Sequence, residues 1–228
     1  KVQSRTATLA LSMEGGGGFE IWQYTSRDTL KANFEIQPGD YGLYAAKIKA
    51  KDVIKTFDYF NKIGLKPLNK PHKSPNGSLS FFIKDPNGNI FQIVESDDWF
   101  SNTKHPSHCG GPNGIIIGAS DINKSLKFYQ DLLEYDKVEY DVTDEFEDMN
   151  CLPGYIGKYR RVKLSHTNKR TGPFSELLGA SEIELIESID RTDCKKIFMD
   201  RYWGDWGFIH LCFDIQGMDL LKNECEEK

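Results

Sequence analysis

The stretch Ile183–Ser188 (IELIES) carries the pattern that decides the fold, because two earlier stretches repeat it. They are Phe19–Tyr24 (FEIWQY) and Phe91–Ser96 (FQIVES), and each places an acidic or amide residue between large apolar ones. The polar residues are Glu20, Gln92 and Glu184. Neighbouring side chains of a β-strand point to opposite faces, so each polar residue projects away from its apolar neighbours. The repeat predicts strands that aim a polar side chain where a metal or substrate site needs one.

A second repeated phrase predicts two helices. The sequences DVIKTFDYF and DINKSLKFY, which start at Asp52 and Asp121, both space their apolar residues along one helix face. An aspartate at this position accepts hydrogen bonds from the free N–H groups of a helix start. We therefore expect amphipathic helices over 52–64 and 121–134.

Strand signals surround both helices. Apolar runs over 43–50 and 114–119 precede them, and a hairpin follows each. The first hairpin turns through Asp85–Gly88 (DPNG), where Pro presets φ and Asn-Gly tolerates positive φ. The second pairs residues 159–165 with 182–187 across a longer polar connection. With one further strand after each helix, the repeating unit has the order β-α-β-β-β.

The chain divides into two complete units between two partial ones. The expected divisions are 1–40, the last hairpin of a first module; 41–100, a second module; 101–112, a linker; 113–190, a third module; and 191–228, the first strand and helix of a fourth. We interpret the chain as a segment of a longer protein, because the unit at each end is only half present. The repeats matter for this division, since one such unit cannot bury its apolar face alone. The expected fold class is α+β, with tandem βαβββ modules forming cupped, mostly antiparallel sheets and helices on the outside.

The composition of the chain excludes some classes of binding partner. The chain has 228 residues and a net charge of −5, without a basic patch, which argues against nucleic acid as a partner. No apolar stretch is long enough to cross a membrane, so we expect no membrane partner. The five cysteines are scattered and form no C-x-x-C pair, as expected of a reduced cytoplasmic protein.

The repeated units, the capped helices and the DPNG turn before Phe91–Ser96 make the chain similar to the vicinal oxygen chelate superfamily. That group includes glyoxalase I, extradiol dioxygenases and the bleomycin- and fosfomycin-resistance proteins. The turn and its following strand are the most specific part of the resemblance, which covers essentially the whole chain. It implies that two units pair into a cupped sheet around one divalent metal, with ligands from the first and last strands of each unit.

The resemblance assigns each ligand position to a residue of this chain. The last-strand positions are Glu20, Gln92 and Glu184. The first-strand position lies seven residues before the capping aspartate, at Ala45 and Gly114, and His210 occupies it in the last partial unit. Ala45 and Gly114 offer no ligand atom. The implied metal residues are therefore Glu184, His210 and Glu20.

The pairing of units decides which residues meet. If the first unit pairs with the second and the third with the fourth, Glu184 and His210 share one ion across the cup. Imidazole and carboxylate suit Zn, Ni, Mn or Fe. The resemblance also implies that Glu184 is the catalytic proton shuttle. Gly114 then leaves room for substrate or water, and a third ligand comes from a strand outside the chain.

Three functions remain open. The leading one is a glyoxalase-like lyase or isomerase, whose metal binds adjacent oxygens of a small substrate while a C–H proton moves. The second is a non-catalytic, resistance-type protein that binds a small molecule, which the vacant positions Ala45 and Gly114 favour. The third is an extradiol-type dioxygenase with ferrous iron. Because half units leave unpaired strand edges, we also expect a homodimer; the alternative is that the two terminal halves complete one another as a permuted unit.

Overall fold

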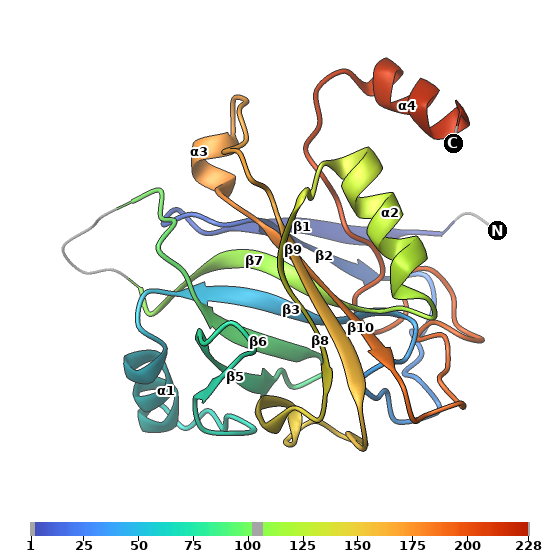
Figure 1. The fold of residues 1–228 in the computed structure, drawn as a ribbon. Helices are drawn as coiled ribbons and strands as arrows, with labels where there is room; N and C mark the ends of the chain where they lie inside the picture. The colour runs from blue at the N-terminus through green and yellow to red at the C-terminus, as the bar shows by residue number, and fades with distance from the viewer. Residues whose placement is uncertain (1–2, 102–106, 228) are drawn as a thin grey trace.

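The computed structural model describes residues 3–101 and 107–227, and its main feature is one eight-stranded sheet (Figure 1). The strands of this sheet are β3 (Gly42–Ala50), β4 (His72–Lys73), β5 (Leu79–Lys84), β6 (Ile90–Glu95), β7 (Cys109–Gly118), β8 (Lys137–Asp144), β9 (Tyr159–Ser165) and β10 (Glu182–Ser188). They lie in the order β4-β5-β6-β3-β7-β10-β9-β8. This order is that of two βαβββ units placed with their first strands, β3 and β7, side by side.

The central strands join the two halves of the sheet. β3 pairs antiparallel with β7, with Ala46 opposite Ile115 and Lys47 opposite Gly114. In each half the last strand runs parallel to the first, β6 beside β3 and β10 beside β7. The second unit thus pairs with the third, and the expected pairing of first with second and third with fourth is wrong. Each first strand is the open edge of its own unit, so the two cover each other's backbone groups.

The expected fold class is confirmed. The chain is α+β, with tandem βαβββ modules in a curled, mostly antiparallel sheet and helices on its outside (Figure 1). The main helices, α1 (Val53–Lys62) and α2 (Ile122–Leu133), lie where the sequence predicts them. The Asp52 carboxylate accepts a 2.9 Å hydrogen bond from the Lys55 N–H, and Asp121 accepts one of 3.1 Å from Lys124. These caps fix where both helices begin.

The sheet has an apolar face beneath the helices and a mixed inner face. The apolar side chains under α1 and α2 come from alternating strand positions: Ala46, Ala50, Phe81, Ile93, Ile115, Ile117, Val162, Leu164, Ile183 and Leu185. On the inner face, Phe82, Ile116 and Ile186 pack with Met149 of the short 3-10 helix η1 (Glu147–Met149). Charged side chains are buried beside this second apolar group. The alternation of strand side chains therefore separates the core from the face that resembles a cup.

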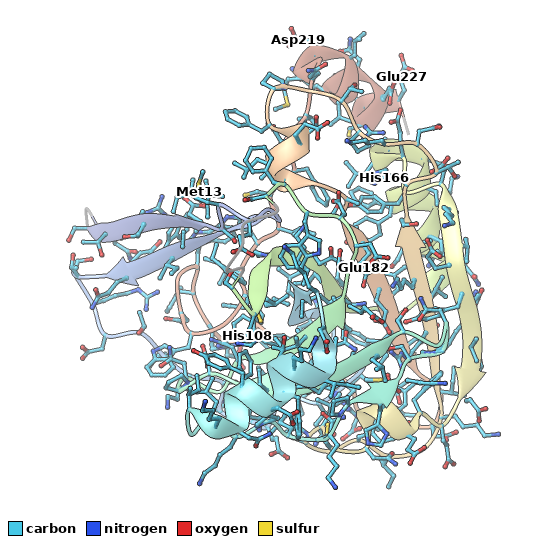
Figure 2. The ribbon with its side chains drawn as sticks, turned by 90° about the vertical axis from the view of Figure 1, so that its left-hand side faces the viewer. Met13, His108, His166, Glu182, Asp219 and Glu227 are labelled. Carbon is cyan, nitrogen blue, oxygen red and sulfur yellow. The ribbon has the colours of Figure 1, made fainter. Side chains whose placement is uncertain are left out.

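A separate hairpin, β1 (Arg5–Leu11) with β2 (Gly18–Tyr24), reaches out from the body of the molecule (Figure 2). Its glycine loop attaches it to β7. The Gly17 N–H donates to the Pro112 carbonyl and the Gly111 N–H to the Gly15 carbonyl, both at 2.8 Å. A Cβ on Gly16 would lie 2.8 Å from the Gly111 backbone, so this close approach requires glycine.

The C-terminal segment differs from its expectation. Residues 207–216, all of them described, form irregular chain that belongs to no strand, although we expected the first strand of a fourth module there. Helix α4 (Met218–Glu227) follows and lies beside α2, and a short helix, α3 (Ser175–Leu178), precedes β10 (Figure 1). β7 begins inside the expected linker, whose residues 102–106 lie outside the described residues.

Candidate functional site

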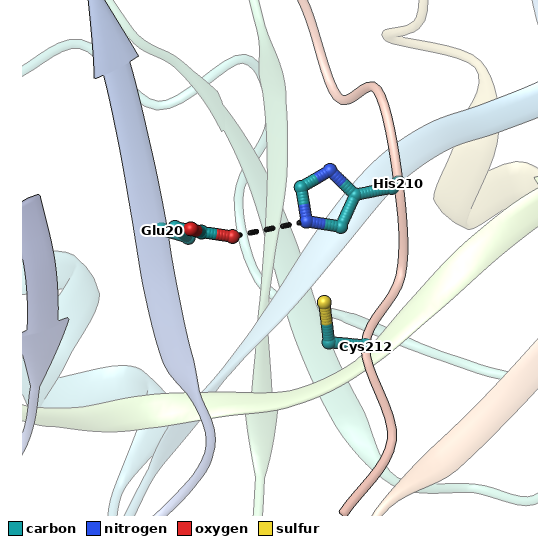
Figure 3. A group of neighbouring side chains, drawn as sticks. All are labelled: Glu20, His210 and Cys212. Atoms are coloured by element: carbon teal, nitrogen blue, oxygen red, sulfur yellow. Dashed lines mark hydrogen bonds and ion pairs between the residues drawn. The ribbon is translucent and has the colours of Figure 1, made fainter. Parts of the chain in front are cut away.

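Two distant parts of the chain meet at Glu20 and His210. The Nε2 atom of His210 lies 3.1 Å from Oε2 of Glu20, on β2 (Figure 3). Cys212 lies beside them, and one ligand atom from each of the three residues falls within 4.8 Å of the others. We name Glu20, His210 and Cys212 the terminal cluster. The two residues that the resemblance assigns to the partial units are thus neighbours.

One phenylalanine of the central sheet holds both segments of the terminal cluster. The ring of Phe91, on β6, contacts Phe19 at a centroid distance of 5.8 Å and Phe208 at 5.5 Å, both edge to face. Phe19 directly precedes Glu20, so strand alternation turns Glu20 to the opposite side. Phe208 lies two residues before His210. Aromatic packing on β6 therefore brings the carboxylate and the imidazole together without a shared strand ladder.

Aromatic rings orient the imidazole of His210. Trp203 stacks on it with a centroid distance of 5.3 Å and an interplanar angle of 12°, and Trp22 lies at 5.1 Å. Arg5 sits 3.5 Å over the Trp22 ring. The Trp22 side chain, and after it His210, hold the pKa of the Glu20 carboxyl below its usual value. The site is open to solvent, because the side chains of His210 and Glu20 are 23% and 40% exposed.

The donor set of the terminal cluster fits a metal ion. Nitrogen, oxygen and sulfur donors from His, Glu and Cys are those that Zn²⁺ accepts, and three protein ligands leave a fourth position for water or substrate. Nδ1 of His210 is buried and has no hydrogen-bond partner among the described residues, unlike a core histidine whose ring is bonded to the backbone. Sequence reasoning missed Cys212. Its position two residues after His210, on the same side of an extended chain, was the available signal.

Glu184 lies elsewhere, inside a buried group of charges on the inner face of the sheet. Its Oε1 accepts a 2.6 Å hydrogen bond from Nε of Arg161, and its Oε2 is 2.7 Å from Nζ of Lys47. Lys47 also lies 2.6 Å from Glu182, and Arg161 donates to Asp148 at 2.8 Å. We name the central charge cluster by its six members: Lys47, Asp148, Arg161, Lys163, Glu182 and Glu184.

The charges of this cluster fix the protonation of Glu184. Burial alone would raise the pKa of its carboxyl, but Arg161 and Lys47 outweigh burial and hold that pKa below its usual value. Burial alone would lower the pKa of Lys47, whereas Glu182 and Glu184 raise it. Both groups therefore stay charged, and a carboxylate held by two cations is a poor proton shuttle.

The expected meeting of Glu184 and His210 does not occur. Each has its own partners, Glu184 in the central charge cluster and His210 in the terminal cluster. Nor does Gly114 leave room for substrate, since a Cβ there would lie 2.1 Å from the Glu182 carbonyl oxygen. Ala45 is fully buried and packs in the apolar core of the inner face.

The central ligand positions do not fit a metal ion. Ala45 and Gly114 supply no donor, Gln92 donates its amide N–H to Ser80 at 3.0 Å, and both oxygens of Glu184 face cations. Sequence reasoning missed Lys47 and Arg161. The available signal was a basic residue at an inward position of a strand that is otherwise buried, as in Gly42–Ala50.

A shallow hollow lies at the rim of the inner face, between the segment after β4 and helix η1. Its volume is about 250 Å³. The residues that line it are Lys73, Ser74, Pro75, Val142, Asp144, Glu145, Phe146, Glu147 and Asp148. Asp148 connects this hollow to the central charge cluster through Arg161. The hollow therefore opens beside the charges rather than between the family ligand positions.

Comparison with known proteins relates part of the chain to a described family. Residues 2–93 match the family model described as the Glyoxalase/Bleomycin resistance protein/Dioxygenase superfamily. The match confirms the resemblance to the vicinal oxygen chelate superfamily that the repeated units predict. No curated protein is significantly similar to the chain in sequence.

Among the described residues, no helix has the length and apolar character needed to span a bilayer.

Solved structures with a similar arrangement include glyoxalase I from Zea mays, with 17% identity and a TM-score of 0.46 over 78% of this chain and 51% of that one. A variant of the maize enzyme gives a TM-score of 0.49 at 17% identity, over 84% of this chain and 61% of that one. Methylmalonyl-CoA epimerase from Streptomyces coelicolor gives 0.32 at 16% identity, over 64% and 97%. The chain thus spans about half the length of the maize enzyme.

Proposed function

We propose that the protein is a glyoxalase-like, metal-dependent lyase or isomerase, and that its metal is held by Glu20 and His210 with Cys212 as a third ligand. The observation that carries the proposal is the meeting of these three donors within 4.8 Å, although they come from opposite ends of the chain. Glu20 and His210 stand at positions that the family uses for ligands. Zn, Ni, Mn and Fe are the candidate ions, and the thiol of Cys212 favours Zn among them.

Each residue of the terminal cluster would have a separate role in binding the metal and the substrate. A bound divalent ion supplies Lewis acidity that polarises a substrate oxygen. The imidazole of His210 presents Nε2 toward Glu20, while Trp22 and Trp203 keep the ring in this orientation. The Glu20 carboxylate, whose pKa is held low, is ionised at neutral pH and is ready to donate a lone pair or to accept a substrate proton.

The proposed substrate is a small molecule with two adjacent oxygen atoms. The cluster is exposed, so such a molecule can approach without a change in the core. The exposed ring of Trp203, which stacks on His210, offers an apolar surface next to the donors. An aromatic wall beside a polar centre is typical of small-molecule sites, in which a few polar groups fix the orientation.

Proton exchange in D₂O tests this function directly. The chain is loaded in turn with Zn²⁺, Ni²⁺, Mn²⁺ or Fe²⁺ and incubated with α-hydroxycarbonyl compounds and hemithioacetals, and NMR follows deuterium at the carbon next to the carbonyl. We expect metal-dependent exchange in the parent and none in His210→Ala. Lys47→Arg, which lies outside the terminal cluster, is the control and retains exchange. Exchange at the same rate in His210→Ala would contradict the proposal.

A non-catalytic, resistance-type binding protein is the second candidate. The central ligand positions favour it, because neither Ala45 nor Gly114 supplies a donor atom. In that case small aromatic compounds bind without metal and without turnover. Equilibrium dialysis with and without a chelator separates the two functions, because metal-independent binding that survives His210→Ala supports the binding protein. Oxygen consumption with bound Fe²⁺ and a catechol would instead indicate the extradiol-type dioxygenase.

We also propose that the protein is a homodimer. Strand β1 pairs only with β2 in the described part of the chain, and all of its residues are exposed. An open strand edge of this length is a template for pairing with another strand. Sedimentation equilibrium checks the mass. A monomer at every concentration up to the millimolar range would contradict the proposal.

A further inference from the structure

Lys47 contacts Glu184, whose position the resemblance assigns to a metal ligand. Its Nζ atom is 2.6 Å from Oε1 of Glu182 and 2.7 Å from Oε2 of Glu184. The Lys47 side chain is 3% exposed and that of Glu184 is 1% exposed, so water does not screen the contact. An ammonium group thus holds two carboxylates together, as a divalent ion does in an oxygen-ligand site.

The register of the sheet explains why a lysine reaches this position. Lys47 lies opposite Gly114 of β7, and Gly114 in turn lies opposite Glu182 of β10. Gly114 has no side chain, so no side chain stands between Lys47 and Glu182. The glycine that removes a family ligand therefore also opens the path for the lysine.

Charge balance makes Lys47 indispensable to the cluster. The central charge cluster has three cationic and three anionic groups, and its members are buried or nearly so. Loss of Lys47 would leave one uncompensated buried carboxylate, which costs several kcal/mol unless another cation replaces the ammonium group.

The oxygen donors that surround the Lys47 ammonium would suit a hard divalent ion. They are the carboxylates of Glu182 and Glu184. Gln92 lies opposite Lys47 in the parallel pair of β3 and β6, and its amide offers a further oxygen donor. Oε1 of Gln92 is buried and has no hydrogen-bond partner among the described residues. Carboxylate and amide oxygens are the donors that Mn²⁺ and Mg²⁺ prefer.

We infer that the ammonium group of Lys47 is a built-in cation that takes the place of the metal in the central half of the protein, and that its removal uncovers a divalent-cation site formed by Glu182, Glu184 and Gln92. The sheet formed by the second and third units then needs no metal ion, because the Lys47 ammonium group already supplies the cation. The inference does not depend on the proposed function, which concerns the terminal cluster.

The test uses a background chain in which the terminal cluster is disabled by Glu20→Gln and His210→Ala. Binding of Mn²⁺ is measured by electron paramagnetic resonance of the free ion, and folding is monitored by circular dichroism. We expect the background chain to bind no Mn²⁺. Addition of Lys47→Ala should create one site per chain and make the melting temperature rise with Mn²⁺ concentration.

Two further variants sharpen the result. Glu184→Gln, added to the Lys47→Ala chain, should abolish the new site. Lys47→Arg keeps a cation in place and should create none. A Lys47→Ala chain that folds but binds no Mn²⁺ would overturn the inference, and so would Glu184-dependent binding in the background chain. A Lys47→Ala chain that folds neither with nor without Mn²⁺ also overturns it, because a divalent ion then cannot replace the ammonium group.

Discussion

The terminal cluster and the central charge cluster both contain a glutamate at the same position of the repeated strand, yet the two glutamates have opposite surroundings. Glu20 is exposed and faces a histidine 3.1 Å away. Glu184 is buried, and Arg161 and Lys47 hold both of its oxygens. A position that the family uses for a ligand therefore does not by itself make a metal site. The cations within reach of the carboxylate decide whether it is free to bind an ion.

Burial explains why the two regions differ. A carboxylate inside the sheet must be paired, because an unpaired buried charge costs several kcal/mol. Arg161 and Lys47 pair with Glu184, so both of its oxygens are already occupied and neither is available to bind a metal ion. Glu20 is solvated and has no such requirement. The exposed position is therefore the one that keeps its donor atoms available.

The largest expected effect comes from breaking the central charge cluster. Arg161→Met leaves Glu184 and Asp148 buried without their main cation, and we expect a loss of about 3–5 kcal/mol in the free energy of unfolding. Arg160→Met is the matched control, because Arg160 pairs with Asp141 near the surface, where ion pairs are worth about 0–1 kcal/mol. Urea denaturation measures both. Equal losses in the two variants would contradict the difference between buried and exposed charge.

A smaller effect is expected from Gly16→Ala, which should weaken the attachment of the β1–β2 hairpin to β7 and leave the eight-stranded sheet intact. Gly16→Ala places a Cβ 2.8 Å from the Gly111 backbone at a φ of +110°. Gly77→Ala is the control, with a φ of +87° and nothing within 4 Å of the new Cβ. Both pay for positive φ, about 1–2 kcal/mol, and only Gly16→Ala adds a clash. Hydrogen exchange should show faster exchange in β2 for Gly16→Ala alone, with β3 and β7 unchanged. Equal protection of β2 in both variants would count against the docking role of the glycine loop.

The pH dependence of stability should report the state of Glu184. The pKa of its carboxyl is lowered on folding from 4.5, so its contribution to stability is fully present above pH 4.5 and is lost as the pH falls toward the folded value. Glu184→Gln removes this contribution. We therefore expect the unfolding free energy of the variant to fall less steeply below pH 4.5 than that of the parent, as measured by urea denaturation at a series of pH values. Parallel curves would show that Glu184 is not held by cations.

The smallest expected effect is chemical protection of one thiol. Cys212 and Cys225 are both exposed and free, but only Cys212 belongs to the terminal cluster. Zn²⁺ should slow the alkylation of Cys212 by iodoacetamide and leave that of Cys225 unchanged, because a bound thiolate is no longer available as a nucleophile. Peptide mass spectrometry follows both residues in one sample. Identical rates for Cys212 with and without Zn²⁺ would remove it from the ligand set.

The sequence predicted the repeated elements better than their association. Local signals placed α1 and α2, because the caps at Asp52 and Asp121 act within one helical turn. The pairing of β3 with β7 was not predictable in this way, since each first strand has the same apolar pattern and chain order does not specify its partner. The expectation that Glu184 and His210 share one ion depended on the wrong pairing of units.

The candidate site was predictable in part. Glu20 and His210 were found through the family positions, and the structure places them together. Lys47, Arg161 and Cys212 escaped notice because their roles depend on neighbours that are distant in sequence. A basic residue in an apolar strand shows that a buried acid must exist, but the pattern does not say which acid.

The most direct test of the central claim is the number of metal ions bound by the parent, His210→Ala and Glu184→Gln chains, each dialysed against Zn²⁺ and measured by atomic emission. The account predicts one ion per chain in the parent, the same number in Glu184→Gln, and none in His210→Ala. Retention of the ion in His210→Ala together with its loss in Glu184→Gln would contradict the account and place the metal in the central half of the protein.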